Sequence, residues 1–155
     1  MTFFIPFAMK KELQLLNLFP FKIGEPYDLN EFKVEDFGIK KGLNNNYEYL
    51  CYKLVSISNI FLFEISPQRG VMLAYNCDFL AQVYYYFYED CFDYFVSKIN
   101  LITYSQMKIA HIKEYGLSKT ARIVLVKSYS LEVILKVDGN TCVRLSNIIH
   151  EDDLV

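Results

Sequence analysis

The segment Cys77–Asn100, CDFLAQVYYYFYEDCFDYFVSKIN, constrains the fold strongly because two of its properties conflict. Its many Tyr and Phe residues favour a strand, since aromatic side chains suit a pleated surface. Its polar residues instead recur at helical intervals, with successive separations of 4, 7, 4 and 4 along Asp78, Gln82, Glu89, Asp93 and Ser97. Because such steps return to one side of a helix, the spacing predicts a long amphipathic helix over 77–100.

The two sides of this predicted helix differ in character. At 100° per residue, the apolar side collects Leu80, Tyr84, Phe87, Cys91, Tyr94 and Phe95, and we expect it to pack on a sheet. The polar side carries acids and tyrosines. Charge on an exposed helix commonly needs no function. However, tyrosine beside carboxylates is also typical of a surface that binds a basic protein. The candidate binding patch is Tyr85, Tyr86, Glu89, Asp90 and Asp93.

The composition predicts one domain over residues 1–155. The chain is 53% hydrophobic and 22% charged, with a formal net charge of -2. A disordered chain would combine low hydrophobicity with high net charge. The near balance of charges also argues against a dedicated nucleic-acid-binding domain, which is usually basic.

The order of predicted elements indicates an α+β fold with a largely antiparallel sheet. We expect a short helix at 10–18, a mixed loop region at 21–42, and strands at 47–55, 60–65 and 71–75. The helix at 77–100 and a shorter helix at 105–115 follow, and strands at 121–127, 131–137 and 141–148 end the chain. Segregated runs of strands and helices are typical of this class, here with two three-strand meanders.

The last hairpin permits a prediction of register. A loop of three residues pairs Val137 with Thr141, Leu135 with Val143 and Val133 with Leu145, which places apolar residues opposite one another. The other face of this hairpin then presents Glu132, Lys136 and Arg144 to solvent.

Cysteine use and segment hydropathy favour a cytoplasmic protein. Cys51, Cys77, Cys91 and Cys142 lack the short spacings of zinc or redox motifs, so we expect free thiols in a reducing compartment. The first residues are apolar before they are basic, which is the reverse of a secretory signal. We also expect no membrane span, because polar residues interrupt every apolar run.

The chain offers little that indicates catalysis. Its six glycines are too dispersed for a phosphate-binding loop. His111 lies beside the apolar stripe of the predicted 105–115 helix, where nothing supplies a nucleophile. His150 opens a terminal run of imidazole and carboxylates without a spaced second set of metal ligands. We therefore predict no enzyme activity, no metal and no cofactor. The run itself forms a second acidic cluster, Glu151, Asp152 and Asp153.

In size, composition and charge, the chain resembles bacterial immunity proteins, including those of contact-dependent growth inhibition systems, although no diagnostic motif carries the resemblance. The resemblance implies a non-enzymatic cytoplasmic protein that inhibits a cognate toxin domain. That partner is expected to be basic and nuclease-like, and to form a 1:1 complex. The two acidic clusters would supply the contact surface.

Two other functions remain open on the sequence. One is a small enzyme or ligand-binding domain whose site lies around His111 and Tyr115, and a deep cavity lined by His111 would favour it. The other is a nucleic-acid-binding module that uses the C-terminal sheet through Arg122, Lys127, Lys136 and Arg144.

Overall fold

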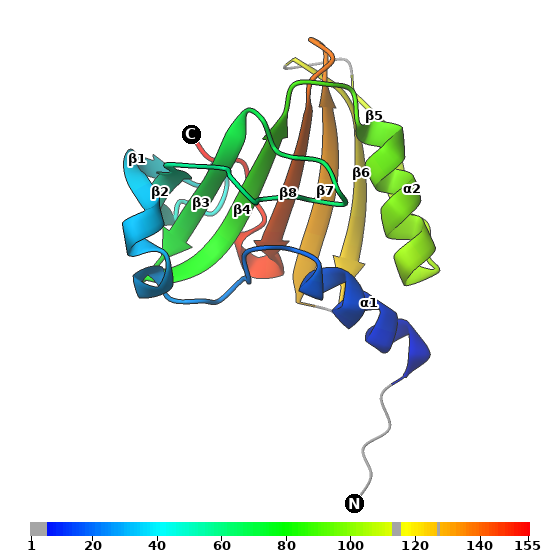
Figure 1. The fold of residues 1–155 in the computed structure, drawn as a ribbon, viewed down its shortest axis with the longest axis horizontal. Helices are drawn as coiled ribbons and strands as arrows, with labels where there is room; N and C mark the ends of the chain where they lie inside the picture. Colours follow the sequence, from blue (N-terminus) through cyan, green and yellow to red (C-terminus); the bar gives the residue numbers. More distant parts are fainter. Residues whose placement is uncertain (1–5, 113–115, 127) are drawn as a thin grey trace, which may run out of the picture.

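The computed structural model describes residues 6–112, 116–126 and 128–155. Within these ranges, eight strands form one antiparallel sheet in the order β1-β2-β3-β4-β8-β7-β6-β5, and two α-helices accompany it (Figure 1). The predicted α+β class with an antiparallel sheet is therefore confirmed. No helix in the described part of the chain has both the length and the apolar character needed to cross a membrane.

The chain builds the sheet in two similar halves. The first half comprises α1 (Phe7–Asn17), η1 (Tyr27–Leu29), η2 (Glu31–Lys33), β1 (Val34–Lys41), β2 (Glu48–Leu54), β3 (Gly70–Asn76) and β4 (Phe79–Phe87). The second half comprises α2 (Phe92–Thr103), β5 (Lys108–His111), β6 (Leu117–Leu125), β7 (Tyr129–Lys136), β8 (Thr141–Asn147) and η3 (Ile148–His150). Each half is a helix followed by a meander of four strands, one more than predicted. The halves join where β4 pairs with β8.

The predicted helix over 77–100 is wrong for its first half. Cys77 and Asp78 form a two-residue turn in which both φ angles are positive, at 50° and 69°, and Asn76 pairs with Phe79 across it. That geometry is the type I′ turn of a β-hairpin. Residues 79–87 then form β4 in the centre of the sheet, with burial on both faces. The helical spacing of Asp78, Gln82 and Glu89 is coincidental, because Gln82 is itself buried.

Helix α2 begins only at Phe92, where local hydrogen bonds favour a helix start. The carboxylate of Asp90 accepts a hydrogen bond from the backbone N–H of Phe92 at 3.1 Å, and Asp93 lies in the first turn. Both acids suit the positive end of the helix dipole. The helix ends at Thr103, and Tyr104 caps it with a left-handed φ of 55°.

The predicted helix at 105–115 is also wrong. Residues 108–111 form the edge strand β5, and residues 113–115 lie outside the described residues. The predicted strand at 60–65 is a turn instead, closed by a bridge between Leu62 and Ile65. The predicted loop at 21–42, which rested on Gly24, Pro26, Gly38 and Gly42, contains strand β1. Gly38 lies at a bulge within this strand and does not end it.

The last hairpin is shifted by two residues from the predicted register. Leu135 pairs with Thr141, Val133 with Val143 and Leu131 with Leu145. A shift of two keeps every side chain on its predicted face, so the hydrophobic pattern cannot detect it. The predicted solvent exposure of the other face is wrong for Arg144, which is buried and lies directly opposite Glu132.

The two faces of the sheet are covered differently. Both helices and the segments 18–33 and 55–69 pack on one face, which we call the helix face. Its core includes Phe19, Tyr85, Phe95, Val133 and Leu145. In Figure 1 the segment after β2 crosses in front of the sheet towards α2 and returns to β3. The C-terminal segment 148–155 covers part of the second face and ends beside β1, where Leu154 bridges Gly42.

The type I′ turn at Cys77–Asp78 offers a test of the corrected fold. The double variant Cys77→Asn/Asp78→Gly is expected to be more stable than the parent by about 1 kcal/mol, because asparagine and glycine accept positive φ at low cost. Thermal unfolding should shift upward by about 2–4 °C. Gly139→Ala is the matched control: φ there is +87° and no atom lies within 4 Å of the added carbon. That variant should lose about 1 kcal/mol. A hairpin variant that is destabilised would contradict the assigned turn.

Candidate functional site: an apolar groove beside an acidic corner

The two tyrosines of the predicted patch lie on opposite faces of the sheet. Tyr85 is fully buried on the helix face, 5.9 Å between ring centroids from Phe19. Burial strongly raises the pKa of its phenol. Tyr86 lies on the second face, where its ring is nearly parallel to that of Tyr84. Neither tyrosine joins the predicted acids in one surface, so this part of the patch is wrong.

The three acids of the patch remain exposed, on the connection from β4 to α2. Glu89, Asp90 and Asp93 are solvent-exposed, and so is Tyr88, which sequence reasoning missed. Two of the acids have structural tasks: Asp90 accepts from Phe92, and Asp93 pairs with Lys119 at 3.7 Å. Glu89 has no ion pair among the described residues. We call Tyr88, Glu89, Asp90 and Asp93 the acidic corner.

The second predicted cluster, at the C-terminus, turns inward and fastens the terminal segment to the sheet. Glu151 accepts from Nε and Nη2 of Arg122 at 2.8 and 2.7 Å. Asp153 accepts from Arg144 at 3.0 Å. Asp152 accepts from the backbone N–H groups of Asn44 and Asn45 at 2.8 and 2.9 Å. Glu151 and Asp152 therefore have structural roles, because their carboxylates accept hydrogen bonds from within the chain. Asp153 is exposed but forms an ion pair with Arg144.

The carboxylate of Asp152 organises the turn after β1. Burial alone would raise the pKa of this carboxyl, but hydrogen bonds from Asn45 and Asn44 lower it overall. Gly42 is required beside it, because a Cβ there would lie 1.9 Å from Oδ1 of Asn45 and 2.8 Å from Oδ2 of Asp152. The terminal segment and the β1–β2 turn thus form one interlocked unit.

The residues considered for catalysis are not gathered into a site. His111 is exposed on the edge strand β5, and Tyr115 lies outside the described residues. The Nδ1 atom of His150 lies 2.8 Å from the hydroxyl of Tyr49, and burial lowers the pKa of this imidazole. Among the described residues, no group of three or more His, Cys, Asp or Glu side chains is placed to hold a metal ion. All four cysteines are free thiols, and only Cys77 is exposed.

A large open groove lies between α2, the end of α1 and the turn at 61–64. Its volume is about 490 Å³. Apolar side chains dominate its lining, and Leu101 is 70% exposed to solvent. The apolar lining consists of Leu18, Phe61, Phe63, Tyr94, Leu101 and Ile102. An open apolar cavity of this size has the character of a binding site for another molecule's apolar groups.

The turn that forms one wall of the groove has an uncommon backbone. Phe63 and Glu64 have φ angles of 48° and 71°, a region that bulky residues rarely enter. Tertiary contacts hold the turn in place: the Phe63 ring lies 6.0 Å from the rings of both Phe19 and Phe95. The hydroxyl of Tyr94 donates to the Phe63 carbonyl at 2.7 Å. The wall is therefore pre-formed by core residues.

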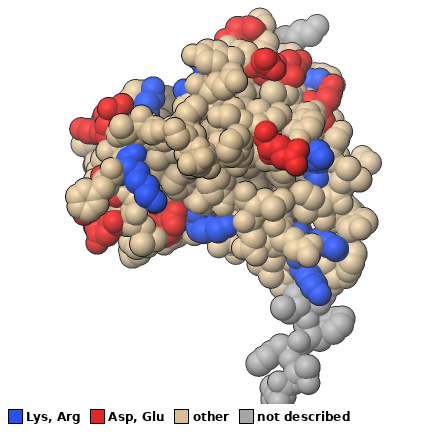
Figure 2. All heavy atoms as spheres, in the orientation of Figure 1, with Lys and Arg blue, Asp and Glu red and all other residues tan. Residues whose placement is uncertain are grey.

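Acidic and basic groups are distributed differently around the groove. Glu64 and Lys98 lie in its lining, and the Lys98 ammonium is 5.5 Å from the centre of the Tyr94 ring. A smaller hollow, bounded by Ile65 on one side and Tyr88 and Glu89 on the other, connects the same turn to the acidic corner. Figure 2 shows acidic atoms over the upper part of this side, where β4 leads into α2, and basic atoms below, towards α1. The groove and the acidic corner therefore share one side of the molecule.

Sequence reasoning missed the groove because its lining comes from three separate segments. Leu18, Phe61 and Leu101 belong to α1's end, the β2–β3 connection and α2, and each is an apolar residue left exposed. An exposed apolar residue is common and carries little signal alone. These three residues can be recognised as one site only after the fold has brought them together.

Comparison of the chain with protein-family models, with curated proteins and with solved structures found no match.

Proposed function

We propose that this protein is a non-enzymatic binding protein whose groove receives apolar side chains of a basic partner protein. The observation that carries the proposal is the position of the groove beside the acidic corner. A pocket filled by a partner's apolar anchor supplies most of the binding energy in many complexes. Nearby carboxylates raise the association rate of a basic partner and orient it.

The partner class we propose is a toxin domain, with this chain acting as its immunity protein in the cytoplasm. The resemblance in size, composition and charge supports this class, and the acids Glu64 and Glu89 suit a basic, nuclease-like partner. A 1:1 complex is the simplest stoichiometry, because the described part of the chain presents one such groove beside one acidic corner. Inhibition would follow from covering the toxin's active site or its substrate-binding surface, and requires no chemistry from this protein.

The groove is tested by Leu101→Lys, which places a charge in its apolar lining. The partner for the test is a basic toxin domain sought among the genes that flank this one. The measurement is calorimetric binding of that domain, together with protection of cells that express it. We expect affinity to fall at least tenfold, because burying an unpaired ammonium against apolar atoms is costly. Since Leu101 is already exposed, stability should change by less than about 0.5 kcal/mol.

The matched control is Ile39→Lys, at a residue that is 65% exposed on β1, the edge strand at the other end of the sheet from β5. This variant should bind like the parent chain. Glu89→Lys in the same assay should slow association at low salt and lose its effect at high salt. Equal affinities for Leu101→Lys and Ile39→Lys would refute the groove as the contact site.

A further inference from the structure

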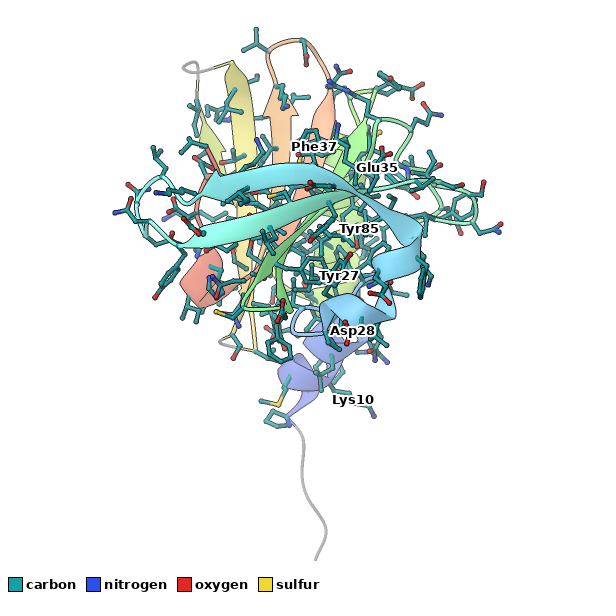
Figure 3. The ribbon with its side chains drawn as sticks, turned by 90° about the vertical axis from the view of Figure 1, so that its left-hand side faces the viewer. Lys10, Tyr27, Asp28, Glu35, Phe37 and Tyr85 are labelled. Carbon is teal, nitrogen blue, oxygen red and sulfur yellow. The ribbon has the colours of Figure 1, made fainter. Side chains whose placement is uncertain are left out.

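The second face of the sheet carries a hollow that the proposed function does not use. Its volume is about 220 Å³, and it lies above the C-terminal segment, which forms its lower wall through Asp153 and Leu154. Its floor is uncharged and partly aromatic, formed by Phe37 of β1, Met72 of β3, and Tyr84 and Tyr86 of β4. The Tyr84 and Tyr86 rings are nearly parallel, at 10°. Figure 3 shows Phe37 and Glu35 on β1 and Lys10 far away on α1.

Cations lie over the aromatic rings of this face. The Lys53 ammonium is 4.1 Å from the centre of the Phe37 ring, and that of Lys40 is 5.5 Å from the same point. The Lys136 ammonium is 5.8 Å from the centre of the Tyr86 ring. At the upper end of β3, where this face borders the acidic corner, Arg69 lies 5.6 Å from the ring of Tyr88. These four cations form no ion pair with any residue of the described ranges.

The nearby acids are mostly engaged elsewhere. Asp153 and Glu132 both accept hydrogen bonds from Arg144, at 3.0 and 2.8 Å. Two further acids lie near these cations: Glu35, directly opposite Lys53 in the β1–β2 ladder, and Asp138, which interacts electrostatically with Lys136 and Arg69. The upper part of the face is therefore locally basic although the chain as a whole is acidic, and a partner that binds it should be anionic.

The distance over which these four cations are spread indicates an elongated ligand. Lys40 and Lys53 lie on β1 and β2, whereas Lys136 ends β7, and β1 and β7 are five strand positions apart. At ~4.8 Å between neighbouring strands, that distance is roughly 24 Å. A single small anion cannot bridge it, but an extended chain with repeated negative charges can.

We propose that this face binds single-stranded nucleic acid, with phosphates on Lys40, Lys53, Lys136 and Arg69 and bases on the rings of Phe37 and Tyr86. Aromatic rings on an open sheet flanked by cations are the arrangement that holds unpaired bases and their backbone. The aromatic floor favours this ligand over an acidic peptide, which gains little from stacking. The site differs from the C-terminal one expected from the sequence, because Arg122 and Arg144 are occupied by carboxylates of the terminal segment.

The test is fluorescence anisotropy of the full chain with labelled 15-nucleotide RNA and DNA single strands of mixed sequence. With four phosphate contacts, the slope of log K against log salt should be about -3. The double variant Lys53→Glu/Lys136→Glu should weaken binding at least tenfold at 50 mM salt. Tyr86→Leu should weaken it about fivefold or more through lost stacking.

The matched control is Lys10→Glu/Lys98→Glu, which changes net charge equally on the helix face. It should leave the affinity within twofold of the parent. The groove variant Leu101→Lys should also bind the strands normally, so this proposal and the proposed function fail independently. Absence of binding at 50 mM salt would overturn the inference, as would equal loss in both double variants. Binding of poly-glutamate with the same affinity, unaffected by Tyr86→Leu, would assign the face to an acidic protein instead.

Discussion

Arg144→Met is expected to destabilise the protein by about 3–5 kcal/mol at neutral pH, because it leaves a buried carboxylate without its cation. Arg144 is only 7% exposed. Its guanidinium donates to Glu132 at 2.8 Å, to Asp153 at 3.0 Å and to the backbone carbonyl of Asp152 at 3.1 Å. The single side chain therefore neutralises an acid in the sheet and fastens the terminal segment. Urea unfolding followed by far-ultraviolet circular dichroism measures the loss.

The destabilisation should depend on pH in a definite direction. Burial raises the pKa of Glu132, and Arg144 offsets part of that rise. Without Arg144 the pKa of Glu132 rises further above its unfolded value of about 4.3. Between these two pKa values, Glu132 is protonated in the folded variant and ionised in the unfolded chain. Its stability is accordingly greatest below the unfolded pKa and falls as pH rises through the folded pKa. We expect Arg144→Met to cost less at pH 4 than at pH 7.

The double variant Arg144→Met/Glu132→Leu distinguishes two roles of Arg144: neutralising the carboxylate of Glu132, and attaching the C-terminal segment to the sheet. Replacing both members of a buried ion pair by apolar residues is often close to neutral. Asp153 is exposed and can remain hydrated. We therefore expect the double variant to recover most of the lost stability and to lose the pH dependence. A double variant as unstable as Arg144→Met alone would show that attachment of the terminal segment is the dominant role of Arg144.

Phe95→Ala is the second change with a large expected effect, a loss of about 3–5 kcal/mol, because it opens a cavity under α2. Phe95 is fully buried, and its ring centroid lies 4.8 Å from that of Phe87 and 6.0 Å from that of Phe63. Thermal unfolding should shift downward by about 10 °C or more. Because Phe63 and the neighbouring Tyr94 form part of the groove, partner binding should weaken even at temperatures where the variant is folded.

Leu101→Ala is the control for this prediction. It removes an apolar side chain of the same helix that faces solvent, so its cost should stay below about 0.5 kcal/mol. A loss of less than about 1.5 kcal/mol for Phe95→Ala would contradict the prediction. It would mean that the layer beneath the groove repacks around the missing ring.

Much of the sheet could be predicted from residue type and spacing. Strands β2, β3, β6, β7 and β8 lie where alternation or Val, Ile and Leu content indicated them, and α1 occupies most of the predicted 10–18 helix. The largest error, the helix predicted over 77–100, arose because a buried polar residue was interpreted as exposed. Gln82 is buried because its amide donates to the carbonyl oxygens of His150 and Asp152, a contact between residues far apart in sequence.

The candidate site was less predictable. Glu89, Asp90 and Asp93 are exposed together as expected, but Tyr85 and Tyr86 are separated by the pleat of β4. Adjacent residues of a strand point to opposite faces, whereas in a helix they would have been neighbours. Because the segment is a strand, Tyr85 is buried, Tyr86 lies on the second face, and Tyr88 is the tyrosine exposed beside the acids.

The Cys77–Asn100 segment marks the boundary between local and tertiary information. Its aromatic content already favoured a strand. Residue patterns alone were enough to predict the α+β class, the antiparallel sheet and the exposure of Glu89, Asp90 and Asp93. Long-range contacts determine which faces are buried: helices and two connecting segments cover one side of the sheet, and the C-terminal segment covers part of the other. The polarity of a side chain shows that it needs hydrogen-bond partners, but it does not show whether solvent or the protein interior supplies them. Gln82, Glu132 and Arg144 form hydrogen bonds to partners inside the fold, whereas the apolar side chain of Leu101 is exposed to solvent.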